Sequence, residues 1–193
     1  MTFEEIQKTL KNYSIGIAGA GGLGSNCAVA LARSGIGKLV IADFDVVDKS
    51  NLNRQYYFVD QIGKAKVEAL KENIARINPD TIVVAHNVKI EQSNIEDIFA
   101  HCHIIVEAFD VGEMKKMIVE TVLEKLPKTP IISGIGMAGW GNTNSIKTRN
   151  IDNLYLCGDE TSEVSETNPP LAPRVGIVAN MQANTVLELI LGK

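Results

Sequence analysis

The stretch "YSIGIAGAGGLGSN", residues Tyr13–Asn26, decides the fold. An apolar, strand-like run leads into Gly19, Gly21 and Gly24, and a helical pattern follows over Leu23–Arg33. Glycines at these spacings allow a tight turn, the close approach of a phosphate and close helix packing, while the helix N-terminus supplies oriented amides. The stretch therefore predicts a strand, a turn and a helix that bind a nucleotide.

Outward from this unit, short β-rich runs alternate with helical patterns, as a parallel sheet with crossover helices requires. The expected strands are Tyr13–Ala18, Lys38–Ala42, Thr81–Ala85, His103–Glu107 and Pro130–Ser133. The expected helices are Leu23–Arg33, Lys64–Ile77, Gly112–Leu126 and Val175–Leu191. We predict an α/β, Rossmann-like fold with a mostly parallel sheet, helices on both faces and antiparallel strands in the C-terminal part.

Composition suits one domain over residues 1–193, because 45% of the chain is hydrophobic and 22% is charged. A net charge of -4 disfavours nucleic acid and anionic membrane surfaces as partners. No apolar signal core or membrane-length run is present, so we expect a cytoplasmic protein. Acids and the Asn168–Pro170 turn signal make Thr148–Pro173 an expected irregular crossover loop.

A second motif, "IADFDVVDKSNLNRQYYF" over Ile41–Phe58, specifies the nucleotide more closely. Asp43 lies about twenty residues after the glycine turn, where a carboxylate receives ribose hydroxyls. Arg54 and Lys66 suit a triphosphate, whose pyrophosphate leaving group gathers charge. The candidate nucleotide-binding residues are Gly19, Gly21, Gly22, Gly24, Asp43, Asp45, Asn51, Arg54, Gln55, Lys66 and Asp110.

Asp110 follows the apolar run "HIIVEAF", at the expected carboxyl end of the fourth strand. Open α/β sheets place ligand-binding groups at that edge. The carboxylate could hold Mg²⁺ beside the phosphates, or it could instead cap the next helix.

Several segments resemble the ThiF/MoeB adenylyltransferases, the bacterial relatives of ubiquitin-activating enzymes. These are "GAGGLGS", "DFDVVDKSNLNRQ", "GKAKVEAL", "INP", "VEAFD" and "PRVGIVANMQANTVLELI", in the family's order across nearly the whole chain. The resemblance implies an ATP- and Mg²⁺-dependent adenylyltransferase. Its substrate would be the C-terminal glycine of a small ubiquitin-like sulfur carrier, in thiamine biosynthesis.

The resemblance also implies roles for single residues. Asp43 would bind the ribose, Lys66 would bind the phosphates, and Asp110 would bind the magnesium ion. Arg54 would reach the phosphates across a homodimer, with Asn51 and Gln55 assisting. The catalytic candidates are Arg54, Lys66, Asp110 and Cys157.

Cys157 corresponds in position to a sulfur-handling cysteine on the family's mobile crossover loop, where a sulfur donor protein could act. Acidic neighbours would oppose its ionisation, so an exposed bystander is the competing interpretation. Cys27 and Cys102 are expected in the core.

Two departures from the family pattern are visible. The paired zinc cysteines are missing, so we expect no zinc site. The N-terminal helix of many members is expected to be absent before Tyr13.

Two other functions stay open. A nicotinamide-dependent oxidoreductase would share the glycine turn and Asp43, but it would leave Arg54 and Lys66 without a role. A non-catalytic nucleotide-binding partner would keep the fold and supply only a docking surface.

Overall fold

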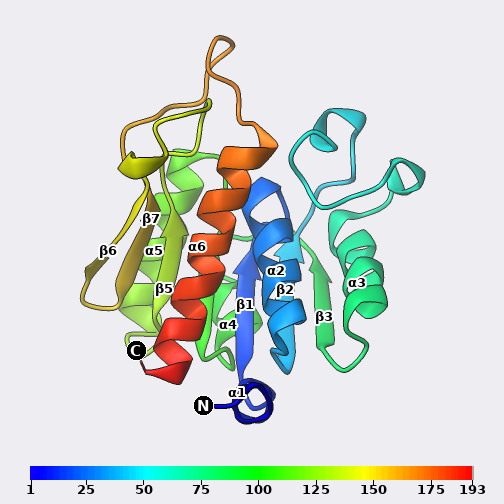
Figure 1. Ribbon diagram of the computed structural model, residues 1–193, viewed down its shortest axis with the longest axis vertical. Coiled ribbons are helices and arrows are strands. Elements are labelled where there is room, and N and C mark those ends of the chain that lie inside the picture. Colours follow the sequence, from blue (N-terminus) through cyan, green and yellow to red (C-terminus); the bar gives the residue numbers. More distant parts are fainter. Residues whose placement is uncertain (193) are drawn as a thin grey trace.

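A seven-stranded sheet forms the centre of the computed structural model, which describes residues 1–192 (Figure 1). Its strand order is β3-β2-β1-β4-β5-β7-β6. The strands are β1 (Ser14–Ala18), β2 (Lys38–Asp43), β3 (Ile82–Asn87), β4 (Ile104–Glu107), β5 (Ile131–Gly134), β6 (Lys147–Ile151) and β7 (Leu154–Gly158). Every neighbouring pair is parallel except β6 and β7, which are antiparallel. The predicted Rossmann-like sheet with a C-terminal antiparallel pair is confirmed.

Helices cover both faces of this sheet (Figure 1). They are α1 (Phe3–Leu10), α2 (Gly22–Ser34), α3 (Lys66–Ile77), α4 (Ile95–Phe99), α5 (Gly112–Lys125) and α6 (Ala172–Leu191). One hydrophobic core lies between the sheet and α2, α3 and α6. The second core lies on the opposite face, beneath α4 and α5. This arrangement follows from the right-handed crossovers that join parallel strands.

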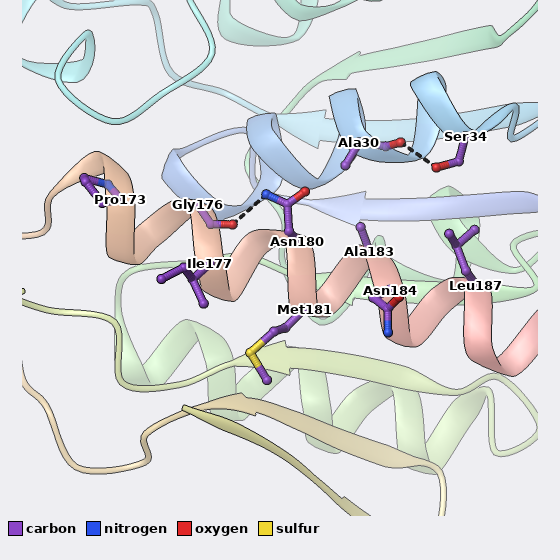
Figure 2. A pocket seen from close by; sticks show the side chains of 10 residues that line it. All are labelled: Ala30, Ser34, Pro173, Gly176, Ile177, Asn180, Met181, Ala183, Asn184 and Leu187. Carbon is purple, nitrogen blue, oxygen red and sulfur yellow. Dashed lines mark hydrogen bonds between the residues drawn. The ribbon is translucent and has the colours of Figure 1, made fainter. Parts of the chain in front are cut away.

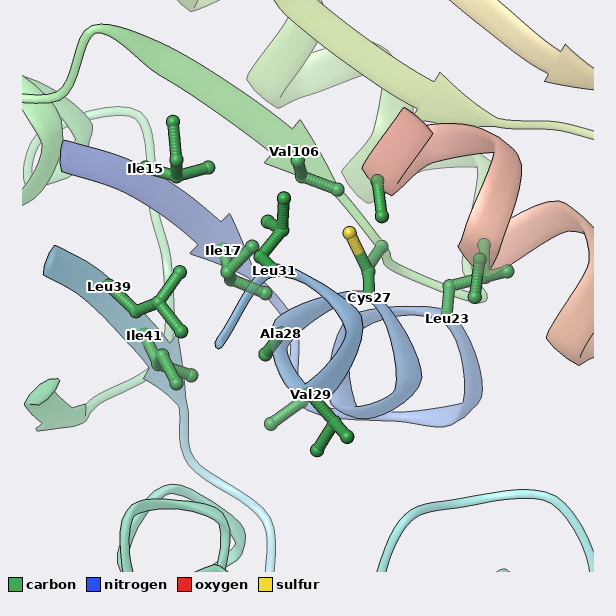
Figure 3. Close-up of a cluster of buried hydrophobic side chains, with 14 of the residues drawn as sticks. Ile15, Ile17, Leu23, Cys27, Ala28, Val29, Leu31, Leu39, Ile41 and Val106 are labelled. Atoms are coloured by element: carbon green, nitrogen blue, oxygen red, sulfur yellow. The ribbon is translucent and has the colours of Figure 1, made fainter. Parts of the chain in front are cut away.

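The central strands are apolar on both sides because both faces of the sheet are covered. Ile15 and Ile17 of β1 belong to the first core, whereas Ala18 belongs to the second. In Figure 3, Ile17 of β1 and Val106 of β4 lie against α2 at Cys27. Such continuous apolar runs explain why the sequence located these strands to within about two residues.

The N-terminal residues form a helix, so the expectation that none precedes Tyr13 is wrong, although this helix carries no arginine like those of the family's Arg-Tyr and Arg-Gln pairs. Thr2 caps α1: its hydroxyl accepts the Glu5 amide, and the Glu5 carboxylate accepts the Thr2 amide at 2.7 Å. Such a capping box satisfies amides that a helix end otherwise leaves free. Leu10 at the other end of α1 is fully buried and anchors the helix on the domain.

The segment Thr148–Pro173 is less irregular than expected. Strands β6 and β7 form a hairpin that reaches Gly158, and the true loop spans only residues 159–171 before α6. Over residues 1–192, the structure has no helix with the length and apolar character needed to cross a bilayer.

The loops that follow the parallel strands gather at one end of the sheet, the upper end in Figure 1. They are the glycine turn after β1, residues 44–65 after β2, residues 108–111 after β4, residues 135–146 after β5 and residues 159–171 after β7. Both termini lie at the opposite end. A parallel sheet thus brings the residues predicted for the site to a common edge.

Candidate nucleotide-binding site

The glycine turn joins β1 to α2 in a geometry that excludes side chains at two positions. Gly19 has a φ of 96°, in the left-handed region that favours glycine. A Cβ on Gly24 would lie 1.8 Å from the Gly19 carbonyl oxygen. Gly21 is the N-cap of α2, and no side chain caps this helix end. The turn therefore presents helix amides to an anion.

Asp43, at the end of β2, is hydrogen-bonded directly to this turn. Its Oδ2 accepts the Ala20 amide at 2.6 Å, and its Oδ1 accepts the Asp45 amide at 2.7 Å. The buried Tyr57 hydroxyl donates to the Ala20 carbonyl at 2.7 Å. Burial, together with the charges of Asp43 and Asp45, raises the pKa of Tyr57, so the hydroxyl stays a donor. The carboxylate expected at the ribose is therefore fixed beside the glycines.

Lys66 begins α3 and is the most buried of the predicted cations. Its side chain is 7% exposed, and Nζ forms an ion pair with Asp45 Oδ2 at 2.7 Å. The Lys66 amide donates to the Asp45 carbonyl at 2.9 Å. The structure thus joins two of the predicted site residues in one contact.

Arg54 and Gln55 lie between the glycine turn and the solvent. The Arg54 guanidinium contacts the Ser50 carbonyl at 3.2 Å and Asn53 Oδ1 at 2.8 Å. Asn26 of α2 holds the Arg54 carbonyl at 2.9 Å, which ties this segment to the helix behind the turn. Gln55 is buried, and its Oε1 has no hydrogen-bond partner. Arg54 is therefore free of carboxylates and can meet phosphate oxygens.

Asn51 has a local role in the structure. Its Oδ1 accepts the Asp48 amide at 3.0 Å and closes the short helical turn Lys49–Asn51. The side-chain oxygen is thereby engaged, so any contribution of Asn51 to phosphate binding would come from its amide nitrogen.

Asp110 is exposed in the turn after β4, at the same edge of the sheet. The N-cap of α5 is Val111, so the alternative that Asp110 caps this helix is wrong. Within residues 1–192, no group of three or more His, Cys, Asp or Glu side chains could hold a metal ion. One exposed carboxylate nevertheless fits Mg²⁺, which keeps water ligands and binds through phosphates.

A buried polar network beneath Asp110 was not predicted. Glu107 is fully buried, and its carboxylate accepts the Phe109 amide at 2.7 Å, the Lys115 ammonium at 3.0 Å and the Ser133 hydroxyl. Lys115 also donates to the Gly134 carbonyl at 2.8 Å. These bonds hold the turn that carries Asp110. The sequence signal was Glu107 itself, because an acid seldom occurs in an apolar strand such as "IIVE".

A second unpredicted ion pair, between Arg174 and Asp159, orders the loops above β5 and β7. Both side chains are at most 6% exposed, and the Arg174 guanidinium also donates to the Gly141 carbonyl. Asp159 Oδ1 accepts the Thr161 amide at 2.9 Å and the Ser162 amide at 2.8 Å. The quoted segment "PRVGIV" contained Arg174, but the sequence offered no partner for it.

Cys157 lies in β7, so the expectation of a mobile loop position is wrong. It is fully buried, and its Sγ lies 3.7 Å from the hydroxyls of both Thr148 and Thr185. Burial raises the pKa of the thiol, hydrogen bonds from Thr185 and Thr148 lower it in part, and Glu188 raises it further. Two acids that follow Cys157 in the sequence pair with arginines: Asp159 with Arg174 and Glu160 with Arg149.

Cys27 and Cys102 are buried, as expected. Burial and the neighbouring Cys157 raise the pKa of Cys27. Burial raises the pKa of Cys102 to about 11, although hydrogen bonding to Ser14 opposes the shift.

A groove of about 750 Å³ lies away from this site, between α2 and α6. Figure 2 shows Asn180, Ala183 and Leu187 of α6 facing it beside Ala30 of α2. No charged side chain lines it. It therefore offers no cation to a triphosphate.

The glycine turn, the ribose-type acid and the two cations at one edge of a parallel sheet define a nucleotide-binding α/β protein. The chain belongs to the ThiF family, whose family model matches residues 1–193. It is 33% identical over 191 residues to the adenylyltransferase and sulfurtransferase MOCS3 of Caenorhabditis briggsae, covering 95% of this chain and 47% of that protein. It is also 33% identical to a probable molybdopterin-synthase adenylyltransferase of Porphyra purpurea, covering 97% of this chain and 50% of that protein.

The chain thus spans about half the length of these curated relatives. Among solved structures, tRNA N6-threonylcarbamoyladenosine dehydratase of E. coli, in complex with AMP, has a TM-score of 0.88. That likeness covers 97% of this chain and 89% of the other at 20% identity, so it supports the fold alone.

Proposed function

We propose that this protein uses ATP to adenylate the C-terminal glycine carboxylate of a ubiquitin-like sulfur carrier. The observation that carries the proposal is the hydrogen bonding of Asp43 to the glycine turn and to Asp45, whose carboxylate pairs with Lys66. Relatives in the ThiF family are named adenylyltransferases, which agrees with this chemistry.

The reaction needs positioning and charge neutralisation more than proton transfer. The carrier's carboxylate is ionised at neutral pH, and its oxygen attacks the α-phosphate, forming an acyl adenylate as pyrophosphate leaves. Lys66 and Arg54 would stabilise the charge that moves onto pyrophosphate, while the amides at the start of α2 hold the phosphates. Mg²⁺, held at Asp110 and the phosphates, would neutralise charge on the leaving group.

Carrier-dependent exchange of labelled pyrophosphate into ATP tests this function. Exchange with an intact carrier, and none with a carrier that lacks its C-terminal glycine, is the expected result. ATP binding without exchange on any carrier would favour the non-catalytic alternative. Binding of NAD in place of ATP, measured by calorimetry, would favour an oxidoreductase.

The identity of the carrier is a finer proposal. The ThiF-like segments favour a thiamine carrier, with a sulfur donor protein acting after the adenylate forms. The two relatives above are named an adenylyltransferase and sulfurtransferase and a probable molybdopterin-synthase adenylyltransferase, so neither name points to thiamine. The exchange assay should therefore compare a thiamine carrier with a molybdopterin-synthase carrier.

We also infer a homodimer in which Arg54 completes the neighbouring site. The inference rests on the resemblance and on the position of Arg54, whose guanidinium hydrogen bonds within residues 1–192 go to Ser50 and Asn53 of its own segment. An arginine without a carboxylate partner is available to a phosphate on another subunit.

A further inference from the structure

Lys66 is a buried cation with a half-exposed partner. Its side chain is 7% exposed, whereas the side chain of Asp45 is 49% exposed. A buried ammonium without a partner is strongly unfavourable, but a carboxylate at the surface is readily hydrated. If the contact between them breaks, water can therefore stabilise Asp45, whereas Lys66 requires another anion.

The backbone holds the two residues together independently of their charges. Val46 and Ala65 form an antiparallel bridge, and the Val47 amide donates to the Lys64 carbonyl at 2.8 Å. Lys66 also donates its amide to the Asp45 carbonyl at 2.9 Å. The side chain of Lys66 consequently stays near this position even if its ammonium changes partners.

The pair lies next to the place where phosphates would arrive. Asp45 donates its amide to Asp43, and Asp43 accepts the Ala20 amide of the glycine turn. Two hydrogen bonds through Asp43 thus link Ala20 of the glycine turn to the backbone of Asp45, whose carboxylate holds Lys66.

We propose that Asp45 is the counter-ion of Lys66 in the nucleotide-free protein and yields the lysine to the phosphates of ATP. The inference rests on the proposed use of ATP. Asp45 is then a positioning residue: it holds the buried ammonium in place, and it competes with the nucleotide. The ion pair opposes ATP binding and thereby sets its affinity.

Asp45→Asn tests the competition, because it removes the charge and keeps the shape. Calorimetry should show MgATP binding roughly fivefold more tightly, the effect of losing a competing ion pair of about 1 kcal/mol. Adenosine, which has no phosphate, should bind as it does to the unchanged protein. Asp45→Glu should restore the original ATP affinity. In exchange assays, the KM for ATP should fall without a rise in kcat.

Glu72→Gln is the matched control, since Glu72 lies on α3 with Lys66 but pairs at the surface with Lys64, which precedes the helix, at 2.9 Å. It should leave ATP affinity unchanged.

A second experiment measures thermal melting without nucleotide. Asp45→Asn should lower Tm by leaving Lys66 unpaired, Asp45→Asn with Lys66→Met should recover most of the loss, and added ATP should raise Tm more in Asp45→Asn than in the unchanged protein.

Weaker binding of both ATP and adenosine to Asp45→Asn would overturn the inference, because Asp45 would then contact the nucleoside. Unchanged ATP affinity would overturn it too. An unchanged protein that binds neither ligand would instead remove the proposed function, and this inference with it.

Discussion

At the scale of single residues, burial decides what Cys157 can do. Its thiol is fully buried and its pKa is raised, so little thiolate forms near neutral pH. We expect Cys157→Ala to keep carrier-dependent exchange, because adenylation needs no thiol. We also expect all three thiols of the native protein to react slowly with a thiol reagent, and quickly after unfolding.

Spectrophotometric thiol counting checks this expectation. Rapid modification of one thiol in the folded protein, lost in Cys157→Ala, would show that β7 opens and would restore a role in sulfur transfer.

Gly24 is a residue at which one methyl group should disrupt the site. Its Cβ would lie 1.8 Å from the Gly19 carbonyl oxygen, and backbone atoms cannot yield that far. We expect Gly24→Ala to cost about 3 kcal/mol or more in unfolding free energy and to abolish ATP binding. Urea unfolding and calorimetry measure the two effects.

Gly176→Ala in α6 is the matched control, since a Cβ added there would have no atom within 4 Å outside the neighbouring backbone of its own helix. Alanine in a helix should stabilise the protein by up to about 1 kcal/mol. Equal behaviour of the two variants would contradict the steric argument.

At the scale of elements, Arg174 joins the first turn of α6 to two loops. Burial opposes ionisation of Asp159, but the Ser162 and Thr161 amides and Arg174 outweigh it and lower the pKa to about 2. Because the folded pKa lies below the unfolded value of about 3.9, the carboxylate stabilises the fold above pH 4. This stabilisation, about 2 kcal/mol, should be lost as the pH falls from 4 to 2.

Denaturant unfolding at several pH values tests this ion pair. Asp159→Asn should be less stable at neutral pH and should lose less stability between pH 4 and 2. Glu160→Gln is the control, because Glu160 pairs with the half-exposed Arg149 and exposed pairs contribute little. An unchanged acid profile in Asp159→Asn would contradict the assignment.

Periodicity predicted the long elements well and the short ones poorly. Helix α2 and strand β1 have strong local patterns, and both were located to within a residue at each end. Helix α1 was missed, although Thr2 and Glu5 have the capping-box spacing. The five residues of α4 are too few to show a helical period, and tertiary burial of Ile95 and Phe99 holds them in place.

At the scale of the whole molecule, the proposed dimer predicts complementation. Arg54→Ala and Asp110→Ala should each lose carrier-dependent exchange by about 100-fold or more. In a mixed dimer, one site would contain both altered residues, Arg54→Ala from one subunit and Asp110→Ala from the other. The second site would contain neither alteration and would stay intact. Such heterodimers, purified with two affinity tags, should recover up to about half of the original activity, because one of two sites works.

Analytical ultracentrifugation should show the dimer first. Verified heterodimers without recovered exchange would place Arg54 in the site of its own subunit. Heterodimers of Arg54→Ala with Lys64→Ala, a surface substitution, provide the control for subunit exchange.

The sequence by itself determined the order of β1 to β5 with α2, α3, α5 and α6, and it located the glycine turn. It could do so because these features depend on local patterns: apolar runs, glycine spacing and the rule that parallel strands end at a common edge. Only the tertiary structure decided which charges meet. Asp45 with Lys66, Glu107 with Lys115, and Asp159 with Arg174 come from separate elements, as do Cys157 and the threonines beside it. Burial and pairing depend on packing between distant segments, which no local pattern in the chain specifies.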